Sequence, residues 1–317
     1  MADTSKPGAD EFSEIARLFR PLTGGAAGAF DLLDDAAVVP QRPGFDLVVT
    51  KDAIVEGVHF PVDEAPGLVA KKLLRVNLSD LAAKAADPFG CFLAVAWPKS
   101  FGPAHREAFA RGLGEDLKTY GVALLGGDTV STPGPFTLSL TALGWVPAGC
   151  MVRRAGAKPG DILAVSGTIG DGALGLAAVR GEIEDPDGFL ASRYRLPTPR
   201  LDLREALAGA SAAADVSDGL IADASHIGEV SHVRLSLDLH KMPLSATARR
   251  WLDLQPDRTA ALVRLATGGD DYEVVAAFTG PPPQGFTVIG TMSAGEGIEV
   301  LVDGAPVAID RAGWRHL

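Results

Sequence analysis

Short apolar segments with the length of β-strands alternate with helical segments along the chain, and this alternation restricts the fold more than any other feature. Phe45 to Val55 is rich in β-branched residues and predicts a strand, whereas Leu68 to Ala86 predicts a long helix. The other expected strands are Ala37 to Val39, Cys91 to Trp97, Val122 to Leu125, Phe136 to Val146, Asp161 to Ser166, Ala213 to Val216, Val233 to Leu239, Tyr272 to Phe278, Phe286 to Gly290 and Ile298 to Val302. The other expected helices are Glu11 to Leu22, Pro103 to Tyr120, Asp171 to Arg180, Arg200 to Ala210, Gly219 to Val230 and two short ones within Ala246 to Ala266. The pattern predicts an α/β or mixed α+β fold.

A domain boundary is expected near residue 150. A chain of 317 residues favours two domains, or one large one. Pro147 to Pro159 combines Pro, Gly and the basic pair Arg153-Arg154 between two apolar strands. We therefore expect one domain over residues 1–150 and a second over residues 151–317.

Charge and composition exclude several classes of protein. The chain has 29 Lys and Arg against 40 Asp and Glu, a net charge of −11, which argues against nucleic acid or an anionic membrane as partner. Its two cysteines, Cys91 and Cys150, form no disulfide framework and no zinc-ligand spacing. The N-terminus lacks a secretory pattern, and the longest apolar run is too short to span a bilayer. A cytoplasmic location is expected.

One glycine motif resembles a dinucleotide site. Gly170, Gly172 and Gly175 give G-x-G-x-x-G after a predicted strand and at the start of a predicted helix. The acidic residue that should end a second strand is replaced by an acidic loop, GEIEDPDG. A helix start that packs tightly on the sheet, or approaches a phosphate through its N–H groups, is the favoured interpretation. The P-loop pattern GxxxxGK[ST] is absent.

Carboxylates recur beside glycines or apolar segments in both halves of the chain. Any one of them is compatible with a turn or a helix cap, but the set favours hard cations bound by oxygen ligands. The members are Asp34, Asp35, Asp52, Asp80, Asp128, Asp215, Asp218, Asp270 and Asp271. Asp80 lies on the apolar stripe of its helix with Val76 and Leu73, where a carboxylate needs a metal, a ligand or the salt bridge that Lys84 offers four residues later. Mg²⁺ would let an acidic protein hold a polyphosphate, and Arg154 suits a phosphate clamp.

Six ordered blocks resemble those of the thiamine-monophosphate kinases, a family in the superfamily of aminoimidazole ribonucleotide synthetase and selenophosphate synthetase. The blocks are VTKDAIVEGVHF (Val49 to Phe60), VNLSDLAAKAADP (Val76 to Pro88), LLGGDT (Leu124 to Thr129), RRAGAKPGD (Arg153 to Asp161), DVSDGLIAD (Asp215 to Asp223) and GGDDYE (Gly268 to Glu273). The resemblance implies a two-domain α/β fold that dimerises through its N-terminal domain. It also implies phosphoryl transfer from ATP to thiamine monophosphate, with several Mg²⁺ ions.

The resemblance also implies roles for particular residues. The metal positions would be Asp35, Thr50, Lys51, Asp52, Asp80, Asp128, Asp215 and Asp218. Gly127, Asp128, Arg154 and Ser217 would contact ATP, and His59, Asp270 and Trp314 would contact thiamine monophosphate. Asp80, Asp128, Asp215 and Arg154 are expected to carry the catalysis, because transfer between two anions depends on positioning and charge neutralisation.

Three departures from the family pattern leave alternatives open. The first acidic block reads Leu32-Leu33-Asp34-Asp35 where GIGDD is usual, Lys51 occupies a position where Thr is common, and Asp270 replaces Glu. Lys51 would then contact a metal only through its backbone carbonyl. An ATP-dependent synthetase acting on a purine precursor and a non-catalytic nucleotide-binding homologue are the alternatives. A selenophosphate synthetase is less favoured, because the chain has no N-terminal Gly-rich loop with Cys.

Overall fold

The computed structural model describes residues 11–314, which fold into two compact units. One unit contains the chain up to Asn77 and Pro88–Gly144, and the other contains Leu78–Asp87 and the chain from Trp145 onward. Helix α2 (Pro66–Ala83) contributes its first turns to the first unit and its last turns to the second. Among the described residues, no helix is long and apolar enough to cross a membrane.

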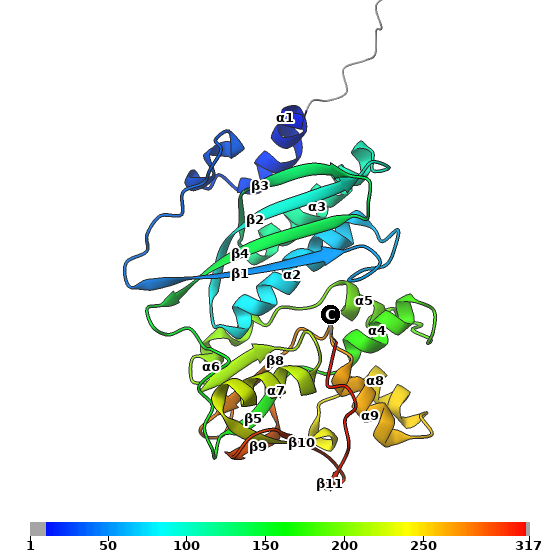
Figure 1. Cartoon of the computed structure of the whole chain (residues 1–317). Helices are drawn as coiled ribbons and strands as arrows, with labels where there is room; N and C mark the ends of the chain where they lie inside the picture. Colours follow the sequence, from blue (N-terminus) through cyan, green and yellow to red (C-terminus); the bar gives the residue numbers. More distant parts are fainter. Residues whose placement is uncertain (1–10, 315–317) are drawn as a thin grey trace, which may run out of the picture. The chain divides into compact units, whose positions relative to one another are not determined.

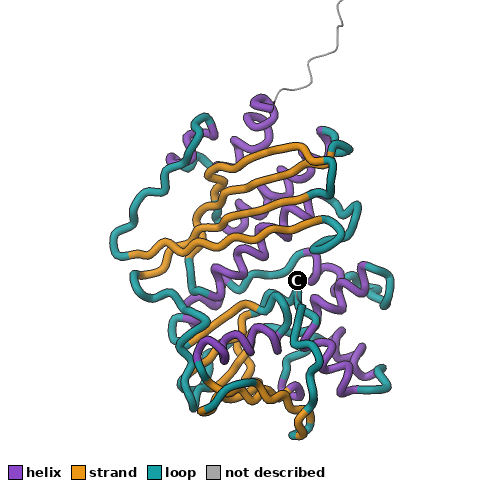
Figure 2. The backbone as a smooth tube through the Cα atoms, viewed as in Figure 1, coloured by secondary structure: helices purple, strands orange, loops and turns teal. Residues whose placement is uncertain are grey.

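The first unit is built on a four-stranded sheet. Its strands are β1 (Phe45–Val55), β2 (Asp87–Pro98), β3 (Ala123–Thr132) and β4 (Thr137–Pro147) in the order β1-β4-β2-β3, with β2 and β3 parallel. The helices α2 and α3 (Pro103–Tyr120) lie on one face of this sheet (Figures 1 and 2). A ring cluster of Phe60, Trp97, Phe109 and Phe136 closes the core, with Trp97 and Phe136 stacked at 5.3 Å between centroids.

The N-terminal segment departs from the predicted single helix. Instead of one helix over Glu11 to Leu22, the chain forms α1 (Glu11–Glu14), a π-helical turn (Ile15–Phe19) and a 3₁₀ turn (Arg20–Thr23) that ends at Gly24, whose φ is 58°. Pro21 lies at the start of the 3₁₀ turn, where it prevents the i→i−4 hydrogen bond that an α-helix would need. A further 3₁₀ segment, Ala27–Leu32, follows it.

Residues Ala37 to Val39 form no strand, contrary to prediction. They pack instead beside a small buried cluster of Ala29, Leu125 and Leu143, and Val38 donates its N–H to Gly28 O at 2.9 Å. Ala37 and Val39 are therefore apolar because they pack against this cluster. The sequence alone did not distinguish such packing from pairing as a strand.

The second unit contains a seven-stranded sheet in the order β11-β10-β7-β9-β5-β8-β6. Its strands are β5 (Ile162–Ser166), β6 (Ala212–Asp215), β7 (Val233–Asp238), β8 (Val274–Phe278), β9 (Phe286–Ala294), β10 (Ile298–Val302) and β11 (Ala305–Pro306). Its helices are α4 (Asp171–Val179), α5 (Phe189–Arg195), α6 (Arg204–Leu207), α7 (Leu220–Ser231), α8 (Ala246–Asp253) and α9 (Arg258–Thr267). The short helix α5 was not predicted, and the expected helix Arg200 to Ala210 is a 3₁₀ turn (Leu201–Leu203) followed by α6.

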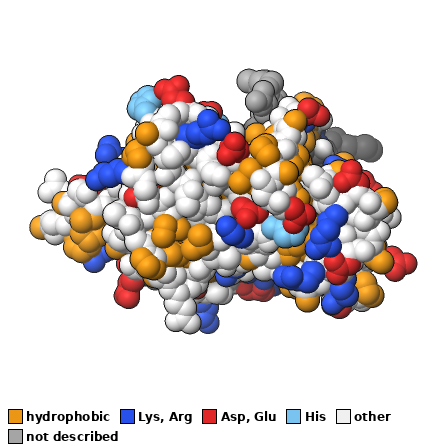
Figure 3. Space-filling view, turned by 90° about the horizontal axis from the view of Figure 1, so that it is seen from below, with side chains coloured by type: hydrophobic (Ala, Val, Ile, Leu, Met, Phe, Trp, Pro, Cys, Tyr) orange, Lys and Arg blue, Asp and Glu red, His pale blue; other side chains and the backbone are white. Residues whose placement is uncertain are grey.

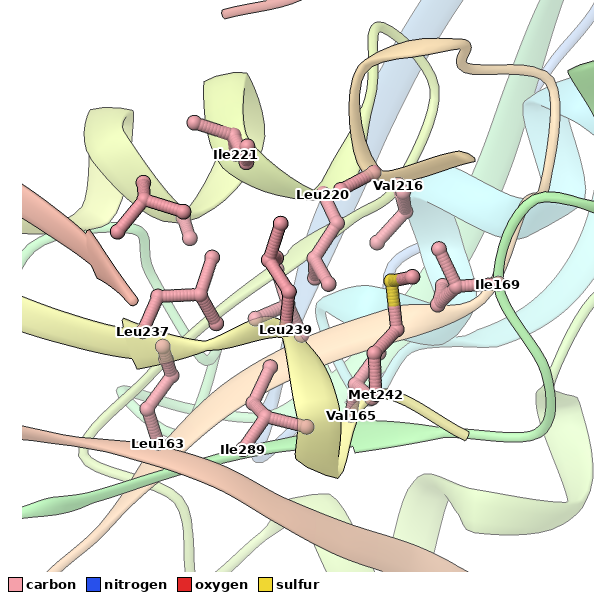
Figure 4. Close-up of a cluster of buried hydrophobic side chains, with 14 of the residues drawn as sticks. Leu163, Val165, Ile169, Val216, Leu220, Ile221, Leu237, Leu239, Met242 and Ile289 are labelled. Carbon is pink, nitrogen blue, oxygen red and sulfur yellow. The ribbon is translucent and has the colours of Figure 1, made fainter. Parts of the chain in front are cut away.

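The central strands of this sheet are buried on both faces. Val275 and Ala277 of β8 join the larger apolar cluster, whereas Val274, Ala276 and Phe278 join a separate one. Successive strand residues point to opposite faces, so an unbroken apolar run is what a doubly covered strand requires. The larger cluster includes Leu163, Val165, Ile169, Val216, Leu220, Ile221, Leu237, Leu239, Met242 and Ile289 (Figure 4).

The surface carries mixed charge. On the face drawn in Figure 3, acidic and basic side chains are interspersed with apolar ones. The net charge of −11 therefore does not form one continuous acidic surface on this face.

Candidate functional site

The first unit contains a pocket of about 530 Å³ that combines an apolar wall with carboxylates. The apolar wall includes Phe12, Ile15 and Phe19 from the N-terminal segment, and the carboxylates are Asp34, Asp35 and Asp128. Its size is typical of small-molecule sites. The pocket brings together three predicted site residues from distant segments, Asp35, Gly127 and Asp128.

Strand β3 places Gly127 and Asp128 in the pocket wall. The sequence predicted a strand only over Val122 to Leu125, with Asp128 beyond its end, but β3 runs to Thr132 and Asp128 pairs with Ala94 of β2. A Cβ on Gly127 would lie 1.9 Å from Leu93 O, so the parallel pairing of β2 and β3 requires glycine at this position. Asp128 is exposed, and its Oδ1 accepts the N–H of Thr129 at 2.9 Å.

The segment before Asp35 has an unusual backbone. Phe30, Asp31 and Leu32 have φ values of 47°, 56° and 57°, in the left-handed region that non-glycine residues rarely adopt. The acidic block Leu32-Leu33-Asp34-Asp35 lacks the glycine of the usual GIGDD pattern. The residues with left-handed backbone, Phe30 to Leu32, lead directly into this block. Such strain is commonly found where a binding site fixes the backbone. Asp34 lines the pocket beside Asp35. The sequence places both in the carboxylate set, whereas the family resemblance assigns a metal role to Asp35 alone.

Strand β1 carries Thr50, Lys51 and Asp52. Thr50 and Asp52 are half-buried and share one face of the strand, whereas Lys51 is exposed on the other. The side chain of Asn77, fully buried on α2, accepts the N–H of Asp52 at 3.1 Å. Ser139 Oγ donates to Asp52 O at 3.1 Å. From its sequence position, three residues before Asp80, Asn77 was expected to orient the Asp80 carboxylate, whereas the structure shows its side chain hydrogen-bonded to the N–H of Asp52 and to Leu73 O. No role was predicted for Ser139.

His59 follows β1 on a short turn. It is half-buried, and its Nδ1 accepts the N–H of Val55 at 3.0 Å. The turn begins with a hydrogen bond from Glu56 N–H to Phe136 O at 3.0 Å. The imidazole is therefore held by the backbone of its own turn.

In the second unit, Asp80 and Asp215 lie in one electrostatic environment with Lys84. Burial raises the pKa of Asp215 well above its usual value, and the charge of Asp80 raises it further. Burial lowers the pKa of Lys84, whereas the Asp215 and Asp80 carboxylates oppose that shift. Lys84 Nζ donates to Ala213 O at 2.8 Å. Asp80 therefore lies near both the lysine and a second carboxylate, and a bound cation would relieve the repulsion between the two carboxylates.

The loop between β6 and α7 is organised by a residue that was not predicted. A single carboxylate oxygen of Asp223 accepts the N–H groups of Ser217, Asp218 and Gly219 at 3.0, 3.1 and 3.2 Å. Burial and the charge of Asp218 raise the pKa of Asp223 to about 6, against those backbone bonds and the charge of Arg154. The side chain of Asp223 therefore holds the loop that leads into α7, and within the described part of the chain neither Asp218 nor another side chain caps the helix. An acidic residue in the first turn of the predicted helix was the signal available in the sequence.

The loop Gly268 to Tyr272 presents Asp270 from a constrained backbone. Asp270 and Tyr272 have φ values of 60° and 53°, and the Tyr272 hydroxyl donates to Asp270 Oδ1 at 3.2 Å. The N–H of Asp270 donates to Ser217 O at 2.9 Å, which joins this loop to the β6–α7 loop. Asp271 accepts the N–H groups of Gly170 and Gly172 at 2.8 and 2.9 Å. The two predicted residues Ser217 and Asp270 are thus directly linked.

The glycines of the G-x-G-x-x-G motif are explained by close packing. A Cβ on Gly172 would lie 2.3 Å from Asp270 O, and a Cβ on Gly175 would lie 2.2 Å from Leu190 O in α5. The motif therefore lets α4 approach both the Gly268 to Tyr272 loop and α5. Close packing was expected from the sequence, but against the sheet, whereas the structure places it against this loop and α5.

A buried ion network supports the same loop. Glu273 is fully buried and accepts Ser166 Oγ at 2.6 Å and Arg193 Nη2 at 2.9 Å, and it also pairs with Arg200. Glu273 belongs to the GGDDYE block, but no role was predicted for it, because its contacts with Ser166, Arg193 and Arg200 form only after folding.

A second pocket, of about 520 Å³, lies beside Trp314. Asp218, His226 and Glu229 contribute polar groups to its wall. The N–H of Trp314 donates to Asp218 O at 2.9 Å, and half of the Trp314 side-chain surface, 50%, is exposed. The structure therefore brings the predicted residues Asp218 and Trp314 together.

The donor set suits Mg²⁺ that is held by few protein ligands. Within residues 11–314, no group of three or more His, Cys, Asp and Glu side chains is gathered as a complete metal site. Mg²⁺ typically binds one or two carboxylates, with water and substrate phosphates as its other ligands. The paired carboxylates Asp80–Asp215 and the Asp34, Asp35 and Asp128 wall fit that mode.

Comparison with known proteins matches both halves of the chain to family models. Residues 33–146 match the AIR synthase related protein N-terminal domain, and residues 158–303 match the corresponding C-terminal domain. The chain is 55% identical to the thiamine-monophosphate kinase of Caulobacter vibrioides over 96% of this chain and 90% of that protein. It is 37% identical to the thiamine-monophosphate kinase of Escherichia coli K12, over 96% and 98% of the two chains.

Solved structures agree with these matches. The crystal structure of thiamine-monophosphate kinase from Stenotrophomonas maltophilia superposes with a TM-score of 0.80 at 36% identity, covering 94% of this chain and 98% of that one. AaThiL complexed with AMPPCP and TMP superposes with a TM-score of 0.79 at 30% identity, covering 97% of each chain. Escherichia coli HypE, a hydrogenase maturation protein, shares the fold at 18% identity, with a TM-score of 0.72 over 96% and 97% of the two chains.

Proposed function

The chain belongs to the thiamine-monophosphate kinase family, and from this premise we propose that it transfers the γ-phosphoryl group of ATP to thiamine monophosphate, giving thiamine diphosphate and ADP. One observation carries the proposal: a relative with the same fold over 97% of its chain is described in complex with AMPPCP and TMP. The acceptor is a phosphate monoester whose second pKa is near 6, so its oxygen is largely anionic at pH 7. No strong general base is then required.

We propose that ATP and thiamine monophosphate contact the residues that the family pattern indicates. Gly127 and Asp128 would meet ATP at the wall of the 530 Å³ pocket, where apolar side chains offer a surface for the base. Arg154 and Ser217 would contact its phosphates, and Arg154 has the forked donors that such a contact uses. The hydrogen bond between Asp270 N–H and Ser217 O supports a shared role for the two loops in positioning both substrates.

Mg²⁺ is the proposed cofactor, and when bound it would neutralise the charge that the two anionic substrates bring together. Its proposed carboxylate and hydroxyl ligands are Asp35, Thr50, Asp52, Asp80, Asp128, Asp215 and Asp218. Lys51 would contribute only its backbone carbonyl, because its side chain lies on the opposite face of β1 from Thr50 and Asp52. His59, Asp270 and Trp314 are the proposed contacts to thiamine monophosphate.

We further propose a cytoplasmic homodimer that forms through the first unit. Leu47 and Val49 of β1 and Val130 of β3 are exposed at 40%, 55% and 51%, which leaves apolar surface on this sheet for a second copy. Both cysteines of the chain are unpaired, as expected in a reducing compartment.

Chromatographic detection of thiamine diphosphate, after incubation with ATP, Mg²⁺ and thiamine monophosphate, tests the proposal. The wild-type protein should form thiamine diphosphate and ADP, and Asp128→Asn should lose activity by about 100-fold or more without loss of fold, because Asp128 is exposed. Formation of ADP and free phosphate with an aminoimidazole product would favour a purine-precursor synthetase instead. Nucleotide binding without turnover would indicate a non-catalytic homologue.

A further inference from the structure

In the turn Val55 to Phe60, both the ring and the backbone N–H of His59 are hydrogen-bonded to Val55. Val55 N–H donates to His59 Nδ1 at 3.0 Å, and His59 N–H donates to Val55 O at 2.9 Å. Gly57 N–H closes the turn on Phe60 O at 2.8 Å, and Phe60 is buried with 3% exposure. A ring nitrogen that accepts a hydrogen bond carries no proton. The proton of the neutral imidazole therefore resides on Nε2.

Lys72 lies on α2 and contacts this turn from the core. Its side chain is only 3% exposed, and its Nζ donates to His59 O at 3.1 Å. Burying an ammonium group costs free energy unless polar groups accept its hydrogen bonds. A methionine would fill a similar space without that cost. The position thus uses a charged donor where packing alone does not require one. The proposed function assigns no role to this lysine.

We propose that Lys72 is a positioning residue that holds the Val55 to Phe60 turn, so that His59 presents the Nε2–H of a neutral imidazole to thiamine monophosphate. This inference rests on the proposed function and specifies the donor that contacts its acceptor substrate. The N–H of a neutral imidazole donates a hydrogen bond without transferring a proton, whereas an imidazolium could protonate an anionic acceptor.

Kinetics of Lys72→Met, with Lys71→Met as its matched control, test the positioning role. Lys71 is the adjacent residue, and it pairs with Glu115 at the surface. Lys72→Met should raise the KM for thiamine monophosphate by about tenfold or more, with the KM for ATP and kcat within about twofold of wild type. Lys71→Met should leave all three unchanged. An unchanged KM for thiamine monophosphate in Lys72→Met, with an active wild type, would overturn the proposal.

Two substitutions of His59 test which nitrogen donates. The amide nitrogen of glutamine reaches the position of Nε2, whereas that of asparagine reaches the position of Nδ1. His59→Gln should keep the KM for thiamine monophosphate within about threefold of wild type, and His59→Asn should raise it by about tenfold or more. The reverse order would contradict the assignment of the proton to Nε2.

The ¹⁵N NMR spectrum of His59 in the folded wild-type protein gives a readout that needs no catalysis. We expect an unprotonated Nδ1 and a protonated Nε2, with this preference weakened in Lys72→Met. A protonated Nδ1 in the wild type would overturn the inference. Because the spectrum is recorded without substrates, it separates failure of this inference from failure of the proposed function, which the absence of thiamine diphosphate would show.

Discussion

Burial of Asp271 should be visible in how the stability of the protein depends on pH. Burial raises the pKa of its carboxyl group to about 8, although the N–H groups of Gly170 and Gly172 oppose the shift. The native state therefore keeps a proton that an unfolded aspartate releases near pH 4. The free energy of unfolding attributable to this group falls as the pH rises from about 4 to about 8.

The variant Asp271→Asn cannot titrate, so its stability should depend less on pH. We expect the midpoint of urea unfolding to fall less between about pH 5 and about pH 8 in Asp271→Asn than in the wild type. The exposed Asp310→Asn should keep the wild-type slope. Equal slopes for the wild type and Asp271→Asn would contradict the raised pKa.

Asp223 should stabilise the protein because its carboxylate accepts hydrogen bonds from three backbone N–H groups. Asp223→Ala leaves the N–H groups of Ser217, Asp218 and Gly219 without that acceptor at the start of α7. A loss of about 1–3 kcal/mol in the free energy of unfolding is expected, with weaker ATP binding because Ser217 is displaced. Thermal melting and calorimetric titration would measure the two effects. Wild-type values for both would show that the loop is held by other contacts.

At the scale of elements, the sequence pattern predicted the bounds of strand β1 and helix α3 but not those of strand β3. Strand β1 (Phe45–Val55) and helix α3 (Pro103–Tyr120) were predicted with their observed bounds, because both have regular apolar patterns and clear ends. Strand β3 was cut short at Leu125, because Gly126, Gly127 and Asp128 resemble a turn. Their extended conformation depends on pairing with β2, which is a non-local contact that local propensity does not contain.

Glycine at position 127 should be essential for this strand pairing. A Cβ in Gly127→Ala would lie 1.9 Å from Leu93 O, so β2 and β3 would have to separate. A loss of about 1–3 kcal/mol in stability is expected, together with loss of ATP binding. Gly134→Ala, where the nearest atom is 3.4 Å away, should be close to wild type in urea unfolding. Equal stability of the two variants would contradict the close approach.

The same contrast applies to the site. The motif residues could be predicted because acidic and glycine-rich blocks interrupt apolar sequence. The residues that hold them could not, since the roles of Asp223 and Lys72 depend on contacts formed only after folding. A buried polar residue on a predicted helix is the signal that such contacts leave in the sequence.

At the scale of the whole molecule, the excess of acidic residues should make stability depend on its ligands. If the predicted carboxylates bind Mg²⁺ with ATP, adding Mg²⁺ and ATP together should raise the free energy of unfolding by about 2.7 kcal/mol at 100 times the dissociation constant. The rise in melting temperature with Mg²⁺ and ATP together should exceed the rise with either ligand alone. This rise should be smaller in Asp128→Asn than in the wild type. The absence of any shift would contradict the assignment of these carboxylates to Mg²⁺ and ATP binding.

Transfer of label from ATP tests the central claim most directly. The protein is incubated with Mg²⁺, thiamine monophosphate and ATP that carries an isotopic label in its γ-phosphoryl group, and the products are separated and counted. We expect the label to appear in the terminal phosphate of thiamine diphosphate in an amount equal to the ADP formed. Label found only in free phosphate, or retained in ATP under conditions where the folded protein binds both substrates, would contradict it.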